Sequence, residues 1–335
     1  MSVEPSVAPV LVRVVRDGVI ESQHRGSVLV ADADGRVLAA LGDPHHPTYV
    51  RSAAKPFQLV ATLDLLARGG LTLDTRGLAI ATASHEGTPD HQVEAARLLA
   101  LAGLDEGALR CPPALPGDEA SLIEQGEATP LAHNCSGKHA AFLLAHVTAG
   151  GAASDYLDLG SVLQRRVQRA LAELTGTAPT GPGVDGCGAP AWVLPLSGLA
   201  TGFARLALGT HGLAPVAGAM RAAPDLVGGE ESVDTRLMRG DRRVVAKRGA
   251  EAVLAAGLAP RPATTAPPAR GLGVAVKVED GGARAVGPVA AAVLAALGAT
   301  VPDAVAAPPV LGGGVAHGAL EVAPELLTLL AGASV

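Results

Sequence analysis

Residues 27–41 read SVLVADADGRVLAAL and give the clearest indication of the fold. Two runs of residues that favour β-strands, 27–31 and 36–41, flank the tetrapeptide Asp32-Ala-Asp-Gly35. A short connection that contains Asp and Gly is typical of a tight turn between antiparallel strands. The stretch therefore predicts a β-hairpin near the N-terminus, preceded by another strand at residues 10–15.

Comparable strand patterns return only near the other end of the chain. Residues 243–246 and 272–278 are rich in Val and Ala, and Glu279-Asp-Gly-Gly282 predicts a turn into a further short strand at 283–286. Between the two ends, residues 52–224 mostly show the apolar spacing of helices, interrupted by loops rich in Pro and Gly.

This order of elements predicts an α+β fold. Because the strands do not alternate with helices as βαβ units would, we expect an antiparallel sheet that combines both chain ends, flanked by helices, with an inserted helical region. The sheet region should comprise residues 1–50 and 225–335, and the mainly helical region residues 51–224. We expect the active site to lie between these two regions.

The composition narrows the class of protein. A net charge of −6 over 335 residues argues against nucleic acid as a partner. The uncharged stretch 285–301 contains Pro288 and is too short to span a membrane, so it predicts a buried helix at about residues 288–297. The N-terminus lacks a basic and apolar leader, and three cysteines do not form a disulfide framework. We therefore expect a cytoplasmic enzyme with no membrane partner.

Lysine is scarce in this chain. Of the 26 basic residues only four are lysine, namely Lys55, Lys138, Lys247 and Lys277. Arginine keeps its proton in proteins, whereas a buried lysine can become neutral and act as a base. The scarcity favours a chemical role for some of these amines, although each is also compatible with an ordinary surface charge.

The segment Arg51-Ser-Ala-Ala-Lys55-Pro-Phe-Gln58 contains a Ser-x-x-Lys motif. On one helical turn the Ser52 hydroxyl and the Lys55 amine would share a face, so a neutral amine there could activate the serine as a nucleophile. Pro56 disfavours helical geometry at the residue before it, unless the motif lies in the first turn of a helix.

A second hydroxyl lies in Ala83-Ser-His-Glu-Gly87, directly after the apolar run 77–83. Ser84 and His85 could both face a pocket at the end of this buried segment. The alternative is a serine that caps a helix beside a surface histidine.

The segment His133-Asn-Cys-Ser-Gly-Lys-His139 is dense in reactive side chains, and a further cysteine, Cys187, follows on the Gly-rich stretch Asp185-Gly-Cys-Gly-Ala189. Two thiolates from Cys135 and Cys187 with a nitrogen ligand would suit zinc with an open fourth position. Lys138 is an unusual ligand, because it must lose its proton to bind. The alternative is that Cys135 and Cys187 are buried and chemically inert. For the third cysteine, Cys111, we expect such an inert, structural role.

Lys247 ends a strand-like run and is followed by Gly249 two positions later. A strand-borne Lys-x-Gly together with a Ser-x-x-Lys is the arrangement found in penicillin-recognising enzymes, where the strand lysine lines the site. Lys277 alternates with Val276 and Val278 along its own strand, so we expect it to face solvent or to support the structure.

Taken together, these motifs resemble the asparaginase II family, typified by the inducible rhizobial asparaginase. The resemblance covers residues 10–300, and the Asn-Cys-Ser-Gly-Lys-His block, residues 134–139, is specific to that family. It implies a fold similar to that of serine β-lactamases and glutaminases. The chain departs from the family pattern at Ala252, where Gly is usual, and at Gly229-Glu-Glu-Ser232.

The resemblance also implies roles for individual residues. It implies two catalytic pairs, Ser52 with Lys55 and Ser84 with Lys247. It further implies a zinc site at Cys135, Lys138 and Cys187, with polar contacts from Arg51 and Asp185. We also expect substrate contacts at His85, Asn134 and Gly249.

The expected activity is hydrolysis of the side-chain amide of L-asparagine, with Ser52 as the nucleophile and Lys55 as its base. Three alternatives stay open: a glutaminase, a β-lactam-type amide hydrolase on the same fold, and an inactive zinc-binding scaffold. The resemblance also implies a homodimer.

Overall fold

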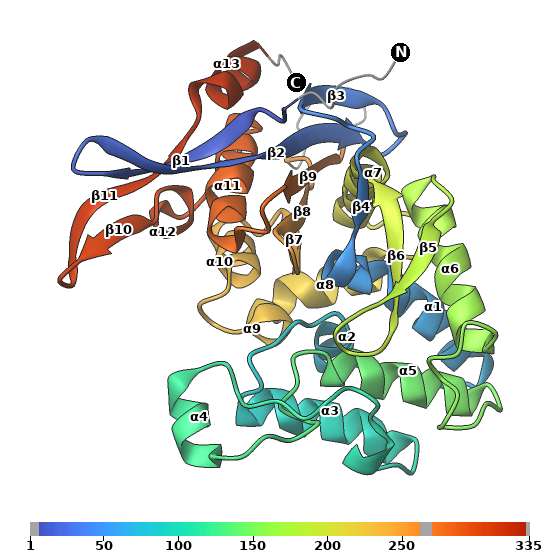
Figure 1. Ribbon diagram of the computed structural model, residues 1–335. Helices are drawn as coiled ribbons and strands as arrows, with labels where there is room; N and C mark the ends of the chain where they lie inside the picture. Colours follow the sequence, from blue (N-terminus) through green and yellow to red (C-terminus); the bar gives the residue numbers. More distant parts are fainter. Residues whose placement is uncertain (1–6, 262–269, 333–335) are drawn as a thin grey trace.

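The computed structural model describes residues 7–261 and 270–332. Its main feature is an eight-stranded antiparallel sheet in the order β10-β11-β1-β2-β9-β8-β7, with β3 paired to β2 (Figure 1). The strands are β1 (Val10–Arg16), β2 (Val19–Asp32), β3 (Val37–Leu41), β7 (Val244–Gly249), β8 (Val253–Leu258), β9 (Leu272–Val278), β10 (Pro309–Gly312) and β11 (Val315–Val322).

The sheet combines both ends of the chain, as the sequence predicted. β1 pairs with β11, and β2 pairs with β9 in a register that sets Val28 opposite Val276. The predicted hairpin at 27–41 is also confirmed, because β2 and β3 pair antiparallel. The Asp32 carboxylate fixes the turn by accepting hydrogen bonds from the backbone N–H groups of Asp34 and Arg36.

Helices cover the sheet and fill the rest of the fold. They are α1 (Lys55–Arg68), α2 (Thr75–Ala81), α3 (Pro89–Leu101), α4 (Glu119–Gln125), α5 (Ser136–Thr148), α6 (Val162–Thr175), α7 (Leu196–Leu208), α8 (Ala214–Ala222), α9 (Pro224–Gly228), α10 (Val233–Gly240), α11 (Val286–Ala296), α12 (Asp303–Ala306) and α13 (Pro324–Gly332). Single 3-10 turns are η1 (Arg51–Ala54), η2 (Glu106–Ala108) and η3 (Ala283–Ala285). Both α7 and α11 pack on the central strands β8 and β9 (Figure 1).

One predicted strand is wrong. Residues 283–286 form η3 and the start of α11 instead of a strand. Pro288 lies in the first turn of α11, where its missing N–H and fixed φ are tolerated, so the helix begins earlier than the Ala-rich pattern indicated. The buried helix predicted over the uncharged stretch is confirmed as α11.

A small second sheet, β4 (Pro47–Tyr49), β6 (Pro190–Pro195) and β5 (Thr180–Val184), has no counterpart in the sequence predictions. Its strands are short and contain Gly and Pro, residues that normally weaken a strand pattern. This sheet matters for the site, because the chain leaves β4 directly into η1 and leaves β5 into the loop that carries Asp185 and Cys187.

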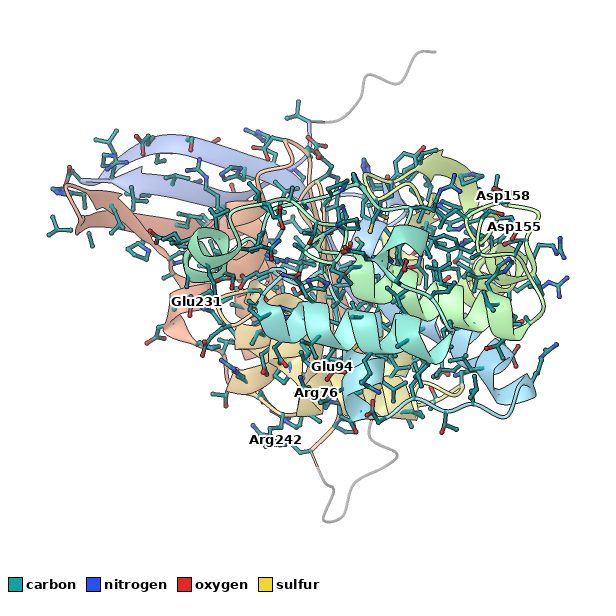
Figure 2. The ribbon with its side chains drawn as sticks, turned by 90° about the horizontal axis from the view of Figure 1, so that it is seen from below. Arg76, Glu94, Asp155, Asp158, Glu231 and Arg242 are labelled. Carbon is teal, nitrogen blue, oxygen red and sulfur yellow. The ribbon has the colours of Figure 1, made fainter. Side chains whose placement is uncertain are left out.

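Ion pairs between α2 and α3 hold the segment that precedes Ser84. Arg76 of α2 forms ion pairs with Asp90 and the buried Glu94 of α3, and Arg76 and Glu94 lie together in Figure 2. This contact anchors the helix that leads into Ser84.

Over the described residues, no helix is both long and apolar enough to cross a membrane.

Candidate active site

Lys55 lies at the centre of a buried polar cluster. It is the first residue of α1, and Pro56 occupies the first turn of that helix, which is the position where proline is tolerated. The Lys55 Nζ atom donates hydrogen bonds to Ser84 Oγ at 3.0 Å, to Cys135 Sγ at 3.1 Å and to the carbonyl of Ala83. Three hydrogen-bond acceptors therefore surround this amine.

Ser52 lies one turn before Lys55, in the 3-10 turn η1. In a 3-10 turn the side chains at i and i+3 are eclipsed, so Ser52 and Lys55 share a face. The structure nevertheless gives the Lys55 amine a different hydroxyl partner: among the described residues, a hydrogen bond joins Lys55 to Ser84 and none joins it to Ser52. Ser52 is half-buried, whereas Ser84 is buried.

His85 is a neutral, fully engaged side chain. Burial, followed by the nearby positive charges, lowers the pKa of its imidazole well below the usual value. Its Nδ1 accepts a hydrogen bond from the Gly87 backbone at 3.0 Å, so its Nε2–H donates to Ser136 Oγ, also at 3.0 Å. The ring stacks on His91, with centroids 4.8 Å apart. These contacts fix the backbone beside Ser84.

Lys247 is completely buried near the end of β7, and its partner is a residue that the sequence did not indicate. Its Nζ donates to Asp234 Oδ2 at 2.9 Å, while the Arg248 backbone N–H donates to Asp234 Oδ1, also at 2.9 Å. Asp234, in the first turn of α10, is also fully buried. No hydrogen bond in the described part of the chain joins Lys247 to Ser84, the pairing that the resemblance implied.

Burial lowers the pKa of Lys247 to about 8, even though the Asp234 carboxylate opposes this shift. The charge of Lys55 acts in the same direction as burial. Lys247 is therefore an amine that can gain or lose a proton near neutral pH. A short acidic residue in a helix's first turn is common, so position 234 offers no sequence signal for this role.

Arg51 and Asp185 join η1 to the loop after β5. The guanidinium contacts Asp185 Oδ1 through Nε at 3.2 Å and Nη2 at 2.8 Å. Gly249, at the end of β7, lies against the same turn, and a Cβ atom there would be 2.9 Å from the Val50 carbonyl oxygen. Glycine at 249 thus lets β7 approach the segment that carries Ser52.

The three predicted metal ligands, Cys135, Lys138 and Cys187, lie together. The Lys138 Nζ donates to Cys187 Sγ at 3.1 Å, and both groups are buried. A hydrogen bond from Cys187, helped by the charges of Lys55 and Lys138, lowers the pKa of Cys135 well below that of an ordinary thiol. Although burial opposes its charge, Lys138 has a raised pKa because of Cys187 and Cys135. Two sulfur atoms and an amine therefore converge in one buried place.

This donor set is compatible with zinc. Ligands of one tetrahedral zinc, with Zn–S of about 2.3 Å and Zn–N of about 2.0 Å, lie roughly 3.5 Å apart, which is close to the separation of Lys138 and Cys187. Binding would require Lys138 to lose its proton. Within the described residues, no group of three or more His, Cys, Asp or Glu side chains is placed to hold a metal, so the amine is essential to such a site.

The remaining residues lie at the edge of the cluster. Asn134 is exposed, and its backbone carbonyl oxygen accepts a hydrogen bond from the His85 backbone N–H. Cys111 is buried apart from the chemistry, and burial raises its pKa to about 12. Lys277 supports the turn after β7 by donating to the carbonyl of Glu251 and, at 2.8 Å, to that of Val278.

One comparison with known protein families agrees with the sequence motifs. A family model described as L-asparaginase II matches residues 12–322. A comparison with curated proteins gives no match. Among solved structures, one described as "Crystal structure of Mglu in its native form in the presence of 4.3M NaCl" aligns with a TM-score of 0.40 and 17% identity. That alignment covers 78% of this chain and 59% of the other, so the chain spans well under two thirds of that protein.

Proposed function

The chain belongs to the L-asparaginase II family, and on this premise we propose that it hydrolyses the side-chain amide of L-asparagine to L-aspartate and ammonia. The observation that best supports this activity is the placement of the Lys55 amine. It lies within hydrogen-bonding distance of a serine hydroxyl, one turn from a second serine, in a cluster from which water is largely excluded. Such an amine can move protons to and from a nucleophilic hydroxyl.

In the mechanism that we propose, Ser52 attacks the amide carbon and forms an aspartyl ester. Ser52 suits this role because it is the less buried serine, and it shares a face with Lys55. A neutral Lys55 accepts the Ser52 proton, and Ser84, hydrogen-bonded to Lys55, passes a proton to the departing nitrogen, which leaves as ammonia. Water then hydrolyses the ester, and its proton returns by the same route.

We also propose that Cys135, Lys138 and Cys187 hold a zinc ion. When bound, the ion would orient polar groups of the substrate; two thiolate ligands make it a poor Lewis acid toward the amide. Lys55 is not proposed as a zinc ligand, although it contacts Cys135. Its proposed role is proton transfer with the two serines. Arg51, His85, Asn134, Asp185 and Gly249 are proposed to shape the substrate pocket.

A substrate panel tests the proposed reaction. We expect ammonia release from L-asparagine, at least tenfold less from L-glutamine because one added methylene displaces the amide carbon from Ser52, and no hydrolysis of a chromogenic β-lactam. Initial rates at matched concentrations provide the measurement. A preference for glutamine or the β-lactam would replace the proposed substrate, and inactivity toward all three would favour the zinc-binding scaffold.

Metal analysis tests the zinc proposal separately. Purified protein should contain about one zinc ion per chain, measured by mass spectrometry of the metal, and Cys135→Ser should lose most of it because a thiolate ligand is removed. Cys111→Ser is the matched control, since Cys111 is buried but lies outside the proposed ligand set, and it should keep its zinc. Metal-free wild-type protein, or equal zinc in both variants, would contradict the assignment.

Four further predictions remain proposals. These are the similarity to the serine β-lactamase fold, the division into a sheet region (1–50 and 225–335) and a helical region (51–224), a homodimer, and a cytoplasmic location.

A further inference from the structure

A cavity of about 390 Å³ is lined by His85, the residue after Ser84, and by two residues with no role in the reaction so far, Glu86 and Arg248. His133 and Asn134 form much of the remaining wall. Arg248 connects the cavity to the catalytic cluster, because its Nη2 atom donates a long hydrogen bond, 3.4 Å, to the Ser84 carbonyl. It also directly follows Lys247 in the chain.

The two charges in this cavity are complementary but not paired. Both side chains are half-buried, and over the described ranges neither takes part in an ion pair within 4 Å. Burial raises the pKa of Glu86, whereas the charge of Arg248 opposes that shift, so the two groups are close enough to interact. Two opposite charges held apart across a cavity leave room for a ligand that carries both charges itself.

The backbone is shaped to keep the Glu86 carboxylate in place. Gly229 has φ of +91°, and a Cβ atom at this position would overlap the carboxylate. The Glu86 carbonyl accepts a hydrogen bond of 2.6 Å from the Gly117 backbone, which fixes the segment from the other side. Gly229 thus opens the space that the Glu86 side chain occupies.

Arg51 and Asp185 also provide opposite charges, but they are already each other's partners at 2.8 Å. A ligand would have to break that contact, and the cost of separating a partly buried pair would oppose binding. Glu86 and Arg248 pay no such cost, because no contact between them has to be broken.

We propose that Glu86 and Arg248 recognise the α-amino acid head group of the substrate, with Glu86 binding the α-ammonium and Arg248 the α-carboxylate. A planar guanidinium matches a carboxylate, and a partly desolvated carboxylate binds an ammonium through charge-assisted hydrogen bonds. In asparagine one methylene separates the head group from the amide carbon, so the proposal requires the amide to extend from this cavity toward Ser84, whose carbonyl contacts Arg248. This inference rests on the proposed function for the identity of the substrate.

Two asparagine analogues test each contact. Succinamate lacks the α-amino group, and 3-aminopropanamide lacks the α-carboxylate. Wild-type protein should prefer asparagine to each by about 10- to 100-fold in kcat/KM, since each analogue forfeits a charged hydrogen bond. The Glu86→Gln variant should lose most of the preference for asparagine over succinamate and keep the preference for asparagine over 3-aminopropanamide. Arg248→Met should show the reverse pattern.

These ratios do not depend on how much of a preparation is folded, because both substrates are assayed on the same sample. Glu173→Gln is the matched control, since Glu173 is exposed and paired with Arg166 away from this cavity, and it should leave both ratios unchanged. Unchanged ratios in Glu86→Gln and Arg248→Met would overturn the inference while leaving the proposed reaction intact.

Calorimetric titration with L-aspartate separates this inference from the proposed reaction. Suppose that the wild-type protein binds L-aspartate but releases no ammonia from L-asparagine, and that both variants bind L-aspartate at least tenfold more weakly. This result would support the head-group site and reject the proposed reaction. Absence of L-aspartate binding and of ammonia release from wild-type protein would overturn both.

Discussion

Ser52→Ala should lower kcat for ammonia release from L-asparagine by roughly 10³-fold or more, because the variant has no hydroxyl to form the aspartyl ester. KM should change little, since Ser52 contributes mainly to the transition state. Ser84→Ala should have a smaller effect, about 10- to 100-fold, if Ser84 only passes a proton from Lys55. Steady-state ammonia assays on both variants provide the comparison.

The contrast between the two serines decides the nucleophile. Mass spectrometry of the protein after rapid acid quenching should detect an added aspartyl group in the wild type and in Ser84→Ala, but not in Ser52→Ala. If Ser52→Ala keeps substantial activity and Ser84→Ala loses it, Ser84 is the nucleophile. In that case the 3.0 Å hydrogen bond from Lys55 marks the reacting hydroxyl directly.

Asp234→Asn should lower the free energy of unfolding by about 1–2 kcal/mol at pH 7, because Lys247 loses its counter-charge and must give up its proton to stay buried. The effect should shrink at pH 9. Burial sets the folded-state pKa of Lys247 at about 8, so above that pH the amine is already neutral and has less need of the carboxylate. Urea unfolding at the two pH values measures the difference.

The sign of the pH dependence follows from linkage. The folded-state pKa of Lys247 lies below the ordinary lysine value of 10.5, so between about pH 8 and 10.5 the unfolded chain binds more protons at this residue. Its contribution to stability therefore rises with pH across that window. The double variant Asp234→Asn/Lys247→Met should recover much of the lost stability.

A surface pair is the control for this experiment. Arg16 and Glu21 are exposed, so Glu21→Gln should change stability by less than about 1 kcal/mol at either pH. An Asp234→Asn variant as stable as Glu21→Gln would show that the buried ion pair does not hold Lys247.

Five strands of the main sheet, β1, β2, β3, β7 and β9, were predictable because they carry their own local patterns, whereas β8, β10 and β11 were not predicted. The hairpin at 27–41 and the run at 272–278 each show β-strand composition, and their positions at opposite ends of the chain indicated that the two ends meet. β5 and β6 were missed, because Gly and Pro hide a strand whose pairing is decided by tertiary contacts.

The residue types of the site and the convergence of Cys135, Lys138 and Cys187 were predictable, but the partners of Lys55 and Lys247 were not. Spacing in the sequence relates only neighbours along a helix, so it joined Lys55 to Ser52 and could not indicate the contact with Ser84, 29 residues away. The same limit applies to Lys247 and Asp234, which meet because β7 packs beside α10. Unpaired charges such as Glu86 and Arg248 become visible only once a cavity is known.

The sheet that unites both chain ends also constrains how the protein is made. β1 and β2 leave the ribosome first, yet their neighbours β11 and β9 end at residues 322 and 278. β1 and β2 can therefore pair with β11 and β9 only after most of the chain has been synthesised. Contacts so distant in sequence slow folding, and the exposed edges of the waiting strands are where chaperones would be most useful during translation.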